Sequence, residues 1–420
     1  MSSGAAARRT RIEIRGDNGQ NVSMNRVKTV LICIFASFII SGFLNPIGLI
    51  SGPVAESFGI PITVAVARFG YFTVGVFAGY ILSFYIFDYV KLKTVVVVGY
   101  VLVAASVGGL YSFPTAPALA FFLFMIGLLA SIQVCGASTL VSWIWSGKPR
   151  QTMLIAQDAM FNGGGIVFTT ITTWFLAANY HWASTYAVVA ALALLIAGIA
   201  ATAEVQEQKD RDEETRIRTS WNLGILTVGG SILLFMIAKI SVFIWAPQFV
   251  EQAFGATIQQ SGRLLTNIFI GAFCGSLIGT YVVSRVRIEY FLIAMLSLGA
   301  TGLSLTIAAS ELQTTLLAGY LVGGSIGATF NAYTAFGLSF VPTPTHKNVA
   351  YLLLAGGTGS AIAPWFSSQV VEITGEVHDA LIACLVIQGV VLVTVLLLTA
   401  YSRRRRRMNV DVVPDSGGSL

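Results

Sequence analysis

The sequence has few charged residues. Only 10% of its 420 residues are Asp, Glu, Lys or Arg, whereas 55% are hydrophobic. A soluble protein of this length covers its surface with many more charged side chains, so the composition excludes that class. It predicts an all-α polytopic membrane protein in the lipid bilayer, because helices satisfy their own backbone hydrogen bonds in lipid.

Cysteine is scarce as well, and the common catalytic motifs are missing. The four cysteines, Cys33, Cys135, Cys274 and Cys384, fall one by one in different apolar segments. This spacing excludes a disulfide framework and a clustered metal site, so we expect neither a metal nor another cofactor. The sequence contains no HExxH, GxSxG or Walker pattern, which argues against an enzyme and against ATP-driven transport.

Much of the charge that is present gathers in one interior stretch. Residues 204–219, EVQEQKDRDEETRIRT, hold six carboxylates and four basic side chains and cannot lie in lipid. Six long apolar segments precede this stretch and six follow it. The predicted organisation is a tail at 1–28, a six-helix bundle at 29–203, a linker at 204–221, a second six-helix bundle at 222–401 and a tail at 402–420.

Each apolar segment is long enough to cross a bilayer as one helix, which takes roughly 20 residues. The first segment is too long for the apolar core of a cleaved signal peptide, so we expect it to stay in the protein. The twelve predicted spans are 29–52, 64–88, 94–113, 117–146, 152–178, 182–203, 222–248, 261–284, 289–309, 312–341, 349–373 and 379–401.

The basic residues predict the orientation of these spans. All but three of the 25 Lys and Arg residues fall in the two tails, in the linker or in loops on the same side as these segments. Lysine and arginine collect in cytoplasmic loops, so we expect a multi-pass protein of the cell inner membrane with both termini and the linker in the cytoplasm. The net charge of +6 then reflects topology, and no nucleic-acid partner is expected.

The two halves resemble each other. Arg68 in the second span and Arg263 in the eighth have matching positions near the outer surface, where we expect their side chains to extend to the interface. Spans 2, 5, 8 and 11 are rich in closely spaced glycines, which let helices approach closely. These spans are expected either to pack statically or to form the seam on which two pseudo-symmetric six-helix bundles rock.

Polar side chains inside a span are costly in lipid and therefore informative. Several of them are candidates for contact with a substrate. They are Ser41, Asn45, Gln133, Asn162, Lys239, Asn267 and Asn331. For each neutral residue the alternative is a hydrogen bond between helices.

Two ionisable residues stand apart. Asp158 is the only carboxylate well inside a predicted span, and Lys239 is the only cation deep within one. Asp158 is therefore the expected proton carrier, and Lys239 is expected to face a cavity and to select a negatively charged solute. A fixed ion pair between Asp158 and Lys239 is the alternative.

Short sequences in and beside the spans carry a resemblance to a known family. They are Val90-Lys91-Leu92-Lys93-Thr94, Ile132-Gln133, Asp158 followed by Phe161-Asn162, Trp245-x-Pro247, Asn267 and Gly356-Gly357. With the twelve-span layout, they resemble the major facilitator superfamily, within it the fucose-permease branch, and most closely the TsgA-like transporters. The resemblance implies two six-helix bundles around a central site that opens alternately to either side of the membrane.

The resemblance also implies roles for particular residues. Gln133 and Asn162 fall where sugar permeases contact substrate, while Asp88, Lys91 and Lys93 form an altered version of the superfamily's charged gating loop. Lys239 stands where relatives have Glu or Gln, and the first span lacks the carboxylate of proton-coupled fucose permeases. These departures argue against proton-coupled transport of a neutral sugar.

The predicted function is secondary active transport of a small polar organic solute by alternating access. Protons are the candidate coupling ion, and Lys239 favours an anionic substrate. A fucose- or hexose-type sugar symporter and a drug or metabolite efflux protein are the alternatives within transport. A channel or a non-transporting membrane sensor is the alternative from another class. The expected partners are the small solute, protons and the bilayer, with the chain acting as a monomer.

Overall fold

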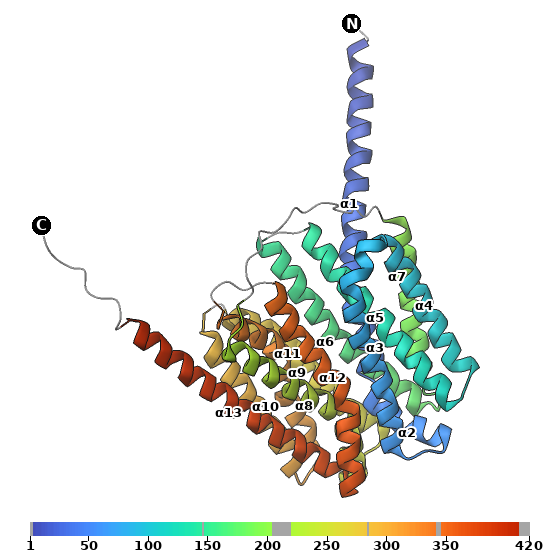
Figure 1. The fold of residues 1–420 in the computed structure, drawn as a ribbon. Coiled ribbons are helices and arrows are strands. Elements are labelled where there is room, and N and C mark those ends of the chain that lie inside the picture. Colours follow the sequence, from blue (N-terminus) through green and yellow to red (C-terminus); the bar gives the residue numbers. More distant parts are fainter. Residues whose placement is uncertain (1–2, 145–146, 204–219, 284, 342–345, 411–420) are drawn as a thin grey trace, which may run out of the picture.

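The structure is a bundle of long helices (Figure 1). The computed structural model describes residues 3–144, 147–203, 220–283, 285–341 and 346–410, and no strand occurs in these ranges. The first half holds α1 (Ser3–Leu44), α2 (Ile47–Phe58), α3 (Ile62–Tyr89), α4 (Leu92–Ser112), α5 (Ala116–Ile144), α6 (Gly147–Ala177) and α7 (Ser184–Thr202). The second half holds α8 (Leu223–Phe254), α9 (Ile258–Val283), α10 (Ile288–Ala308), α11 (Leu312–Leu338), α12 (His346–Thr374) and α13 (Val377–Val410).

Twelve of these helices are long, and each of them corresponds to one of the twelve predicted spans. Within the described part of the chain, nine helices are apolar and long enough to cross a membrane. The long helices outside this set are α6, α11 and α12. Each of them contributes polar residues or glycines to a cavity between the two halves. A helix that faces a cavity on one side needs fewer apolar residues than a helix surrounded by lipid.

The first predicted span, 29–52, is wrong at its end. α1 ends at Leu44, and the separate short helix α2 follows from Ile47. The cause is Pro46, which has no N–H to donate to the preceding turn and whose ring crowds the carbonyl oxygen there. α2 ends at Gly59, whose φ of 61° is a left-handed conformation that glycine adopts readily.

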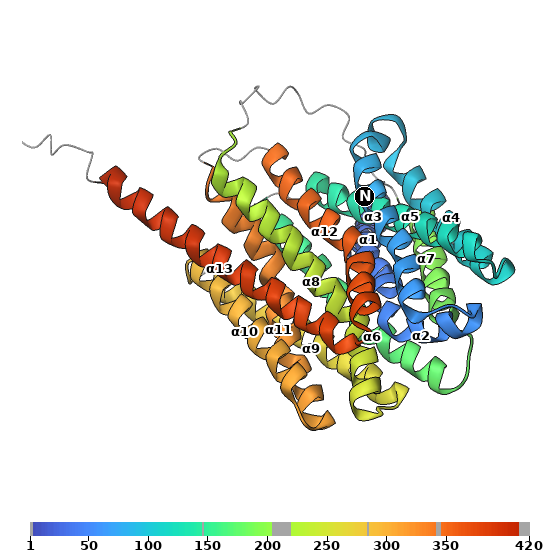
Figure 2. The same cartoon turned by 60° about the horizontal axis from the view of Figure 1, so that its bottom comes forward.

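The helices pair in the same order in both halves. In the first half α1 packs on α6, α3 on α5, and α4 on α7; in the second half the matching pairs are α8 with α12, α9 with α11, and α10 with α13. Figures 1 and 2 show the two groups side by side, with α1 to α7 in one and α8 to α13 in the other. This repeated pairing confirms two pseudo-symmetric six-helix bundles, whereas the predicted linker falls mainly on residues outside those described.

Contact between the bundles runs mainly through two helix pairs, α3 with α12 and α6 with α9, and α2 adds a smaller contact with α8. These are the predicted spans 2, 11, 5 and 8. Some of their glycines allow close packing within one bundle, and others allow close packing between the two bundles. A Cβ atom added at Gly75 or Gly271 would clash with the backbone of a helix in the same bundle, whereas one added at Gly165 would lie 2.4 Å from the Phe269 ring across the boundary. Only some of the glycines therefore serve the seam between the bundles.

Candidate functional site

A cavity of about 600 Å³ lies between the two bundles. Helices α1, α3, α5 and α6 line it from one bundle and α8, α11 and α12 from the other. On α3 the lining runs from Thr73 to Phe87, and on α12 from Leu353 to Ser360. Both segments lie toward the end of the molecule where α7 ends and α8 begins, which we call the linker side. The volume is in the range of small-molecule sites in proteins, roughly 300–1,000 Å³.

Four of the predicted polar residues lie on the wall of this cavity. Asp158 and Asn162 come from α6, Lys239 from α8 and Asn331 from α11, so both bundles contribute. Asn331 donates a hydrogen bond from Nδ2 to Oδ2 of Asp158, which joins α6 to α11 across the cavity. The wall therefore carries one carboxylate that already has an amide partner.

Lys239 has a different environment. Its Nζ atom lies 5.9 Å from the centre of the Phe243 ring, one helical turn further along α8. Among the described residues, the ion pairs are Arg287 with Glu289 and His378 with Asp379, and neither includes Lys239. Asp158 and Lys239 therefore form no direct ion pair in this conformation, although the two charges interact electrostatically. The alternative of a structural pair stays open.

The bundles touch closely on the far side, which we define as the side opposite the linker side. A Cβ atom added at Gly48 in α2 would lie 2.4 Å from the carbonyl oxygen of Phe243 in α8. Pro247 deprives that oxygen of its usual helical donor, because it has no N–H. The side chain of Gln248 donates from Nε2 to the carbonyl oxygen of Gly48 at 2.9 Å, which adds a hydrogen bond to the close approach of α2 and α8.

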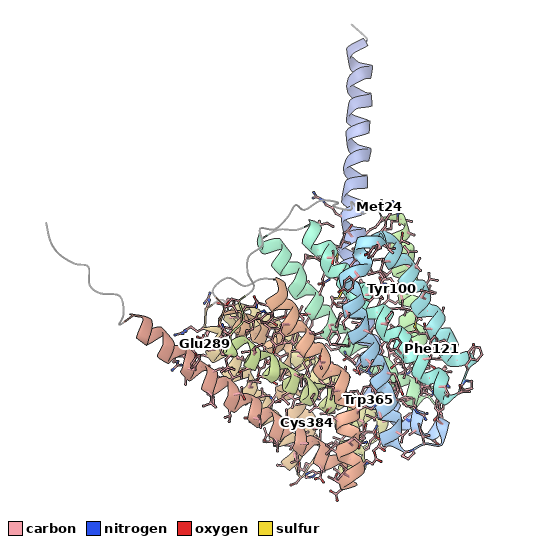
Figure 3. All side chains as sticks on the ribbon, in the orientation of Figure 1. Met24, Tyr100, Phe121, Glu289, Trp365 and Cys384 are labelled. Carbon is pink, nitrogen blue, oxygen red and sulfur yellow. The ribbon has the colours of Figure 1, made fainter. Side chains whose placement is uncertain are left out.

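The helix pairs at the seam also hold the far side together. Thr73 in α3 donates from Oγ1 to the carbonyl oxygen of Ala361 in α12 at 3.2 Å. Figure 3 shows Trp365 where α12 meets α3, and its ring centre lies 6.0 Å from that of Tyr71. Thr169 and Thr266 face each other between α6 and α9, with their hydroxyl oxygens 3.2 Å apart. The cavity is therefore closed off from the far side.

Sequence comparison identifies the family. Residues 30–364 match the pattern of the Major Facilitator Superfamily. The chain belongs to the Major Facilitator Superfamily. It is a multi-pass membrane protein and a secondary transporter, and this superfamily membership argues for a transporter rather than an enzyme.

Individual superfamily members are similar over almost the whole chain. The TsgA homolog of Edwardsiella ictaluri is 23% identical over 390 residues, which cover 91% of this chain and 97% of that protein. TsgA of Escherichia coli is 23% identical over 389 residues, with the same coverage. The chain is thus a TsgA-like member of the superfamily, as its sequence motifs predict.

Two solved structures share the fold. A bacterial homolog of the human lysosomal transporter Spinster, in an inward-facing and occupied conformation, superimposes with a TM-score of 0.68 at 12% identity over 89% of this chain and 97% of that one. The nucleoside transporter NupG superimposes with a TM-score of 0.68 at 13% identity over 90% and 99%. At these identities the likeness concerns the fold alone.

Ser41 and Asn45, two of the predicted substrate contacts, do not line the cavity of this superfamily member. Both are buried. Ser41 donates to the carbonyl oxygen of Phe161 at 2.6 Å and accepts a hydrogen bond from Asn45 Nδ2 at 2.6 Å. In this conformation they fasten the end of α1 to α6, and a role in substrate binding stays a prediction.

Gln133 and Asn267 are also absent from the cavity wall. Gln133 is buried and donates from Nε2 to the carbonyl oxygen of Val95 at 3.2 Å, where it fills the space left by the missing side chain of Gly99. Asn267 donates to the carbonyl oxygen of Leu316 at 2.8 Å. Both satisfy a carbonyl group of a neighbouring helix, so the structure favours the alternative of interhelical hydrogen bonds.

The predicted gating loop joins α3 to α4 on the linker side. The side chain of Asp88 lies outside the described residues. Lys91 is exposed, and Lys93 donates from Nζ to the carbonyl oxygen of Ala203, one residue after α7. Lys93 therefore fastens this loop within the first bundle, and a gating role for the three residues stays a prediction.

The wall also has an aromatic part, which is not among the predicted substrate contacts. Six rings from four helices line the cavity, namely Phe77, Tyr80, Phe87, Phe161, Phe243 and Phe330. Phe77, Tyr80 and Phe87 are spaced by three and seven residues, which places them on one face of α3. That spacing is a usable signal, although lipid-facing aromatics give the same pattern. Cys135 lies on the same wall.

Proposed function

We propose that this transporter moves a small organic anion across the cell inner membrane by alternating access and that Asp158 couples the movement to protons. The linker side faces the cytoplasm, so the structure corresponds to an inward-open state. The observation that supports this proposal most directly is Lys239, a cation on the cavity wall that forms no direct ion pair among the described residues.

A cation in a partly desolvated cavity favours a ligand of opposite charge. A charge-assisted hydrogen bond contributes roughly 1.5–3 kcal/mol, which is more than a hydrogen bond between neutral groups. A neutral sugar or nucleoside offers Lys239 no negative charge. The presence of Lys239 thus favours an anion over the sugar-symporter alternative, and efflux of an anionic metabolite uses the same site.

Two pairs of matched ligands test the charge preference. Phenylacetate and phenylacetamide differ in charge but little in shape, and gluconate and glucose form a hydrophilic pair. Binding to the native state raises the apparent stability of the protein, so melting temperatures in lipid nanodiscs report it. We expect an anion to stabilise the protein more than its neutral partner in at least one pair. Equal stabilisation within both pairs would contradict anion selection.

Asp158→Asn is expected to uncouple transport from protons. Asparagine keeps the size of the side chain and can still hydrogen-bond to Asn331, but it cannot carry a proton. In reconstituted vesicles, uptake driven by a pH gradient should be lost while exchange of substrate across the membrane continues. Val167→Ala, a change at an exposed position of α6 away from the cavity, serves as the control. Uptake that still follows the pH gradient in Asp158→Asn would place coupling elsewhere.

The proposed orientation predicts which surfaces a membrane-impermeant thiol reagent reaches in intact cells. Cysteines introduced at Ser3, Thr215 and Ser416, in the two tails and the linker, should remain unlabelled. A cysteine at Ala256, between α8 and α9 on the far side, should be labelled. Labelling at Thr215 from outside the cell would reverse the assignment.

A further inference from the structure

The polar side chains on the cavity wall are largely occupied by protein acceptors. Ser83 donates to the carbonyl oxygen of Gly79 at 2.7 Å, and Ser360 donates to that of Gly356 at 3.1 Å. Thr73 is bound to the carbonyl oxygens of Gly70 and Ala361. Asn162 donates to Ser276 Oγ at 3.1 Å. A polyhydroxylated ligand needs many free donors on the wall, and these hydroxyl groups have already donated their hydrogen atoms, although their oxygens can still accept.

The two charged groups on the wall differ in how far protein partners already occupy them. One oxygen of Asp158 already accepts a hydrogen bond from Asn331. The ammonium group of Lys239 lies 5.9 Å from the centre of the Phe243 ring and interacts electrostatically with Asp158, but it forms no direct ion pair among the described residues. Lys239 is therefore the polar group on the wall best placed to gain an interaction when a ligand enters.

The rest of the wall is apolar, and much of it is aromatic. Rings approach from α3, α6, α8 and α11, and aliphatic side chains such as Ile240 and Leu353 fill the spaces between them. Burying an apolar surface against such a wall is favourable roughly in proportion to the area removed from water. Aromatic rings add a preference for flat or edge-on partners.

We propose that the substrate is a monocarboxylate with an aromatic or branched apolar body. This inference rests on the proposed function, because it names the body of the anion that Lys239 selects. The carboxylate lies at Lys239, and the body lies among the rings of α3, α6 and α11. Asp158 disfavours a second carboxylate on the same ligand, since like charges repel strongly where water is largely excluded.

The test measures dissociation constants of phenylacetate, phenylacetamide, gluconate and glucose for the full chain in nanodiscs. Phenylacetate should bind most tightly. Lys239→Gln should weaken its binding at least about tenfold, whereas Lys239→Arg, which keeps the charge, should retain most of it. Retention by Lys239→Arg together with an unchanged elution volume for Lys239→Gln excludes misfolding as the cause.

A second variant tests the apolar body independently. Phe77→Ala removes a ring from the cavity wall and should weaken phenylacetate binding roughly two- to tenfold. Phe121→Ala removes a ring that is 57% exposed on α5, away from the cavity, and should leave the binding unchanged. An equal effect of the two variants, or no effect of Phe77→Ala, contradicts contact between the ligand body and the rings.

The four ligands separate failure of this inference from failure of the proposed function. Gluconate that binds through Lys239 while phenylacetate does not would overturn the apolar body and leave anion selection intact. Phenylacetamide that binds as well as phenylacetate, with no effect of Lys239→Gln, would overturn anion selection. Tight binding of glucose alone, or no binding of any ligand, would overturn this inference as well.

Discussion

Gly48→Ala is expected to shift the transporter strongly away from the conformation that is closed on the far side. The added Cβ atom would lie 2.4 Å from the carbonyl oxygen of Phe243 and 2.8 Å from that of Ile244. Both obstacles are backbone atoms of α8, which cannot move aside as a flexible side chain can. Overpacking of this kind costs about 1–3 kcal/mol, which corresponds to a roughly five- to 150-fold shift between two states.

Spin labels on the two helices measure this shift. In a cysteine-free background, labels at Ser57 in α2 and Gln252 in α8, both exposed, report the separation of the bundles on the far side. Gly48→Ala should increase the population with the longer separation and slow substrate exchange. Gly52→Ala is the matched control on α2, because its Cβ atom would have only Gln248 Nε2 within 4 Å, at 3.9 Å. Identical distance distributions in the two variants would contradict closure at Gly48.

Lys239→Gln is expected to weaken the binding of an anionic ligand at least about tenfold, and Asp158→Asn in the same chain is not expected to restore it. A structural ion pair behaves differently, because removing one partner strands the other charge and removing both relieves the strain. The structure shows Asp158 bound to Asn331 and no ion pair between Asp158 and Lys239. The double variant should therefore lack both anion selection and proton coupling.

The test measures melting temperature and ligand binding for the two single variants and the double variant. It distinguishes a structural ion pair from a lysine that selects the substrate. Lys239→Arg is the control that retains the cation. If both single variants are unstable and the double variant recovers stability and transport, the pair is structural. The proposal that Lys239 selects an anion is then wrong.

The helices of this transporter could be predicted from the sequence because the bilayer demands long apolar segments. The break in the first span could not be placed in the same way. Pro46 ends the helix that precedes it, whereas Pro247 lies inside α8, which continues to Phe254. The two prolines look equivalent in the sequence, but packing of the surrounding helices decides whether a proline breaks a span or is accommodated in it.

Only some residues of the candidate site could be predicted from the sequence. Asp158 and Lys239 could be predicted because a charge inside a span is costly unless it faces a cavity or a partner. Neutral residues carry a weaker signal, since a carbonyl group of a neighbouring helix satisfies them equally well. Gln133 and Asn267 are of this kind, whereas Asn331 lines the cavity. Which face of a helix meets the cavity depends on helix rotation, which the spacing of residues alone does not fix.

Alkylation of Cys135 by a membrane-impermeant maleimide tests most directly whether the cavity takes up its ligand from the linker side. Cys135 lines the cavity, and replacing Cys33, Cys274 and Cys384 by alanine leaves it as the single thiol. In vesicles with the linker side outward, we expect labelling of Cys135 that phenylacetate slows and phenylacetamide does not. Equal labelling from the far side, or labelling that neither ligand changes, would contradict an anion-binding cavity that is open to the linker side.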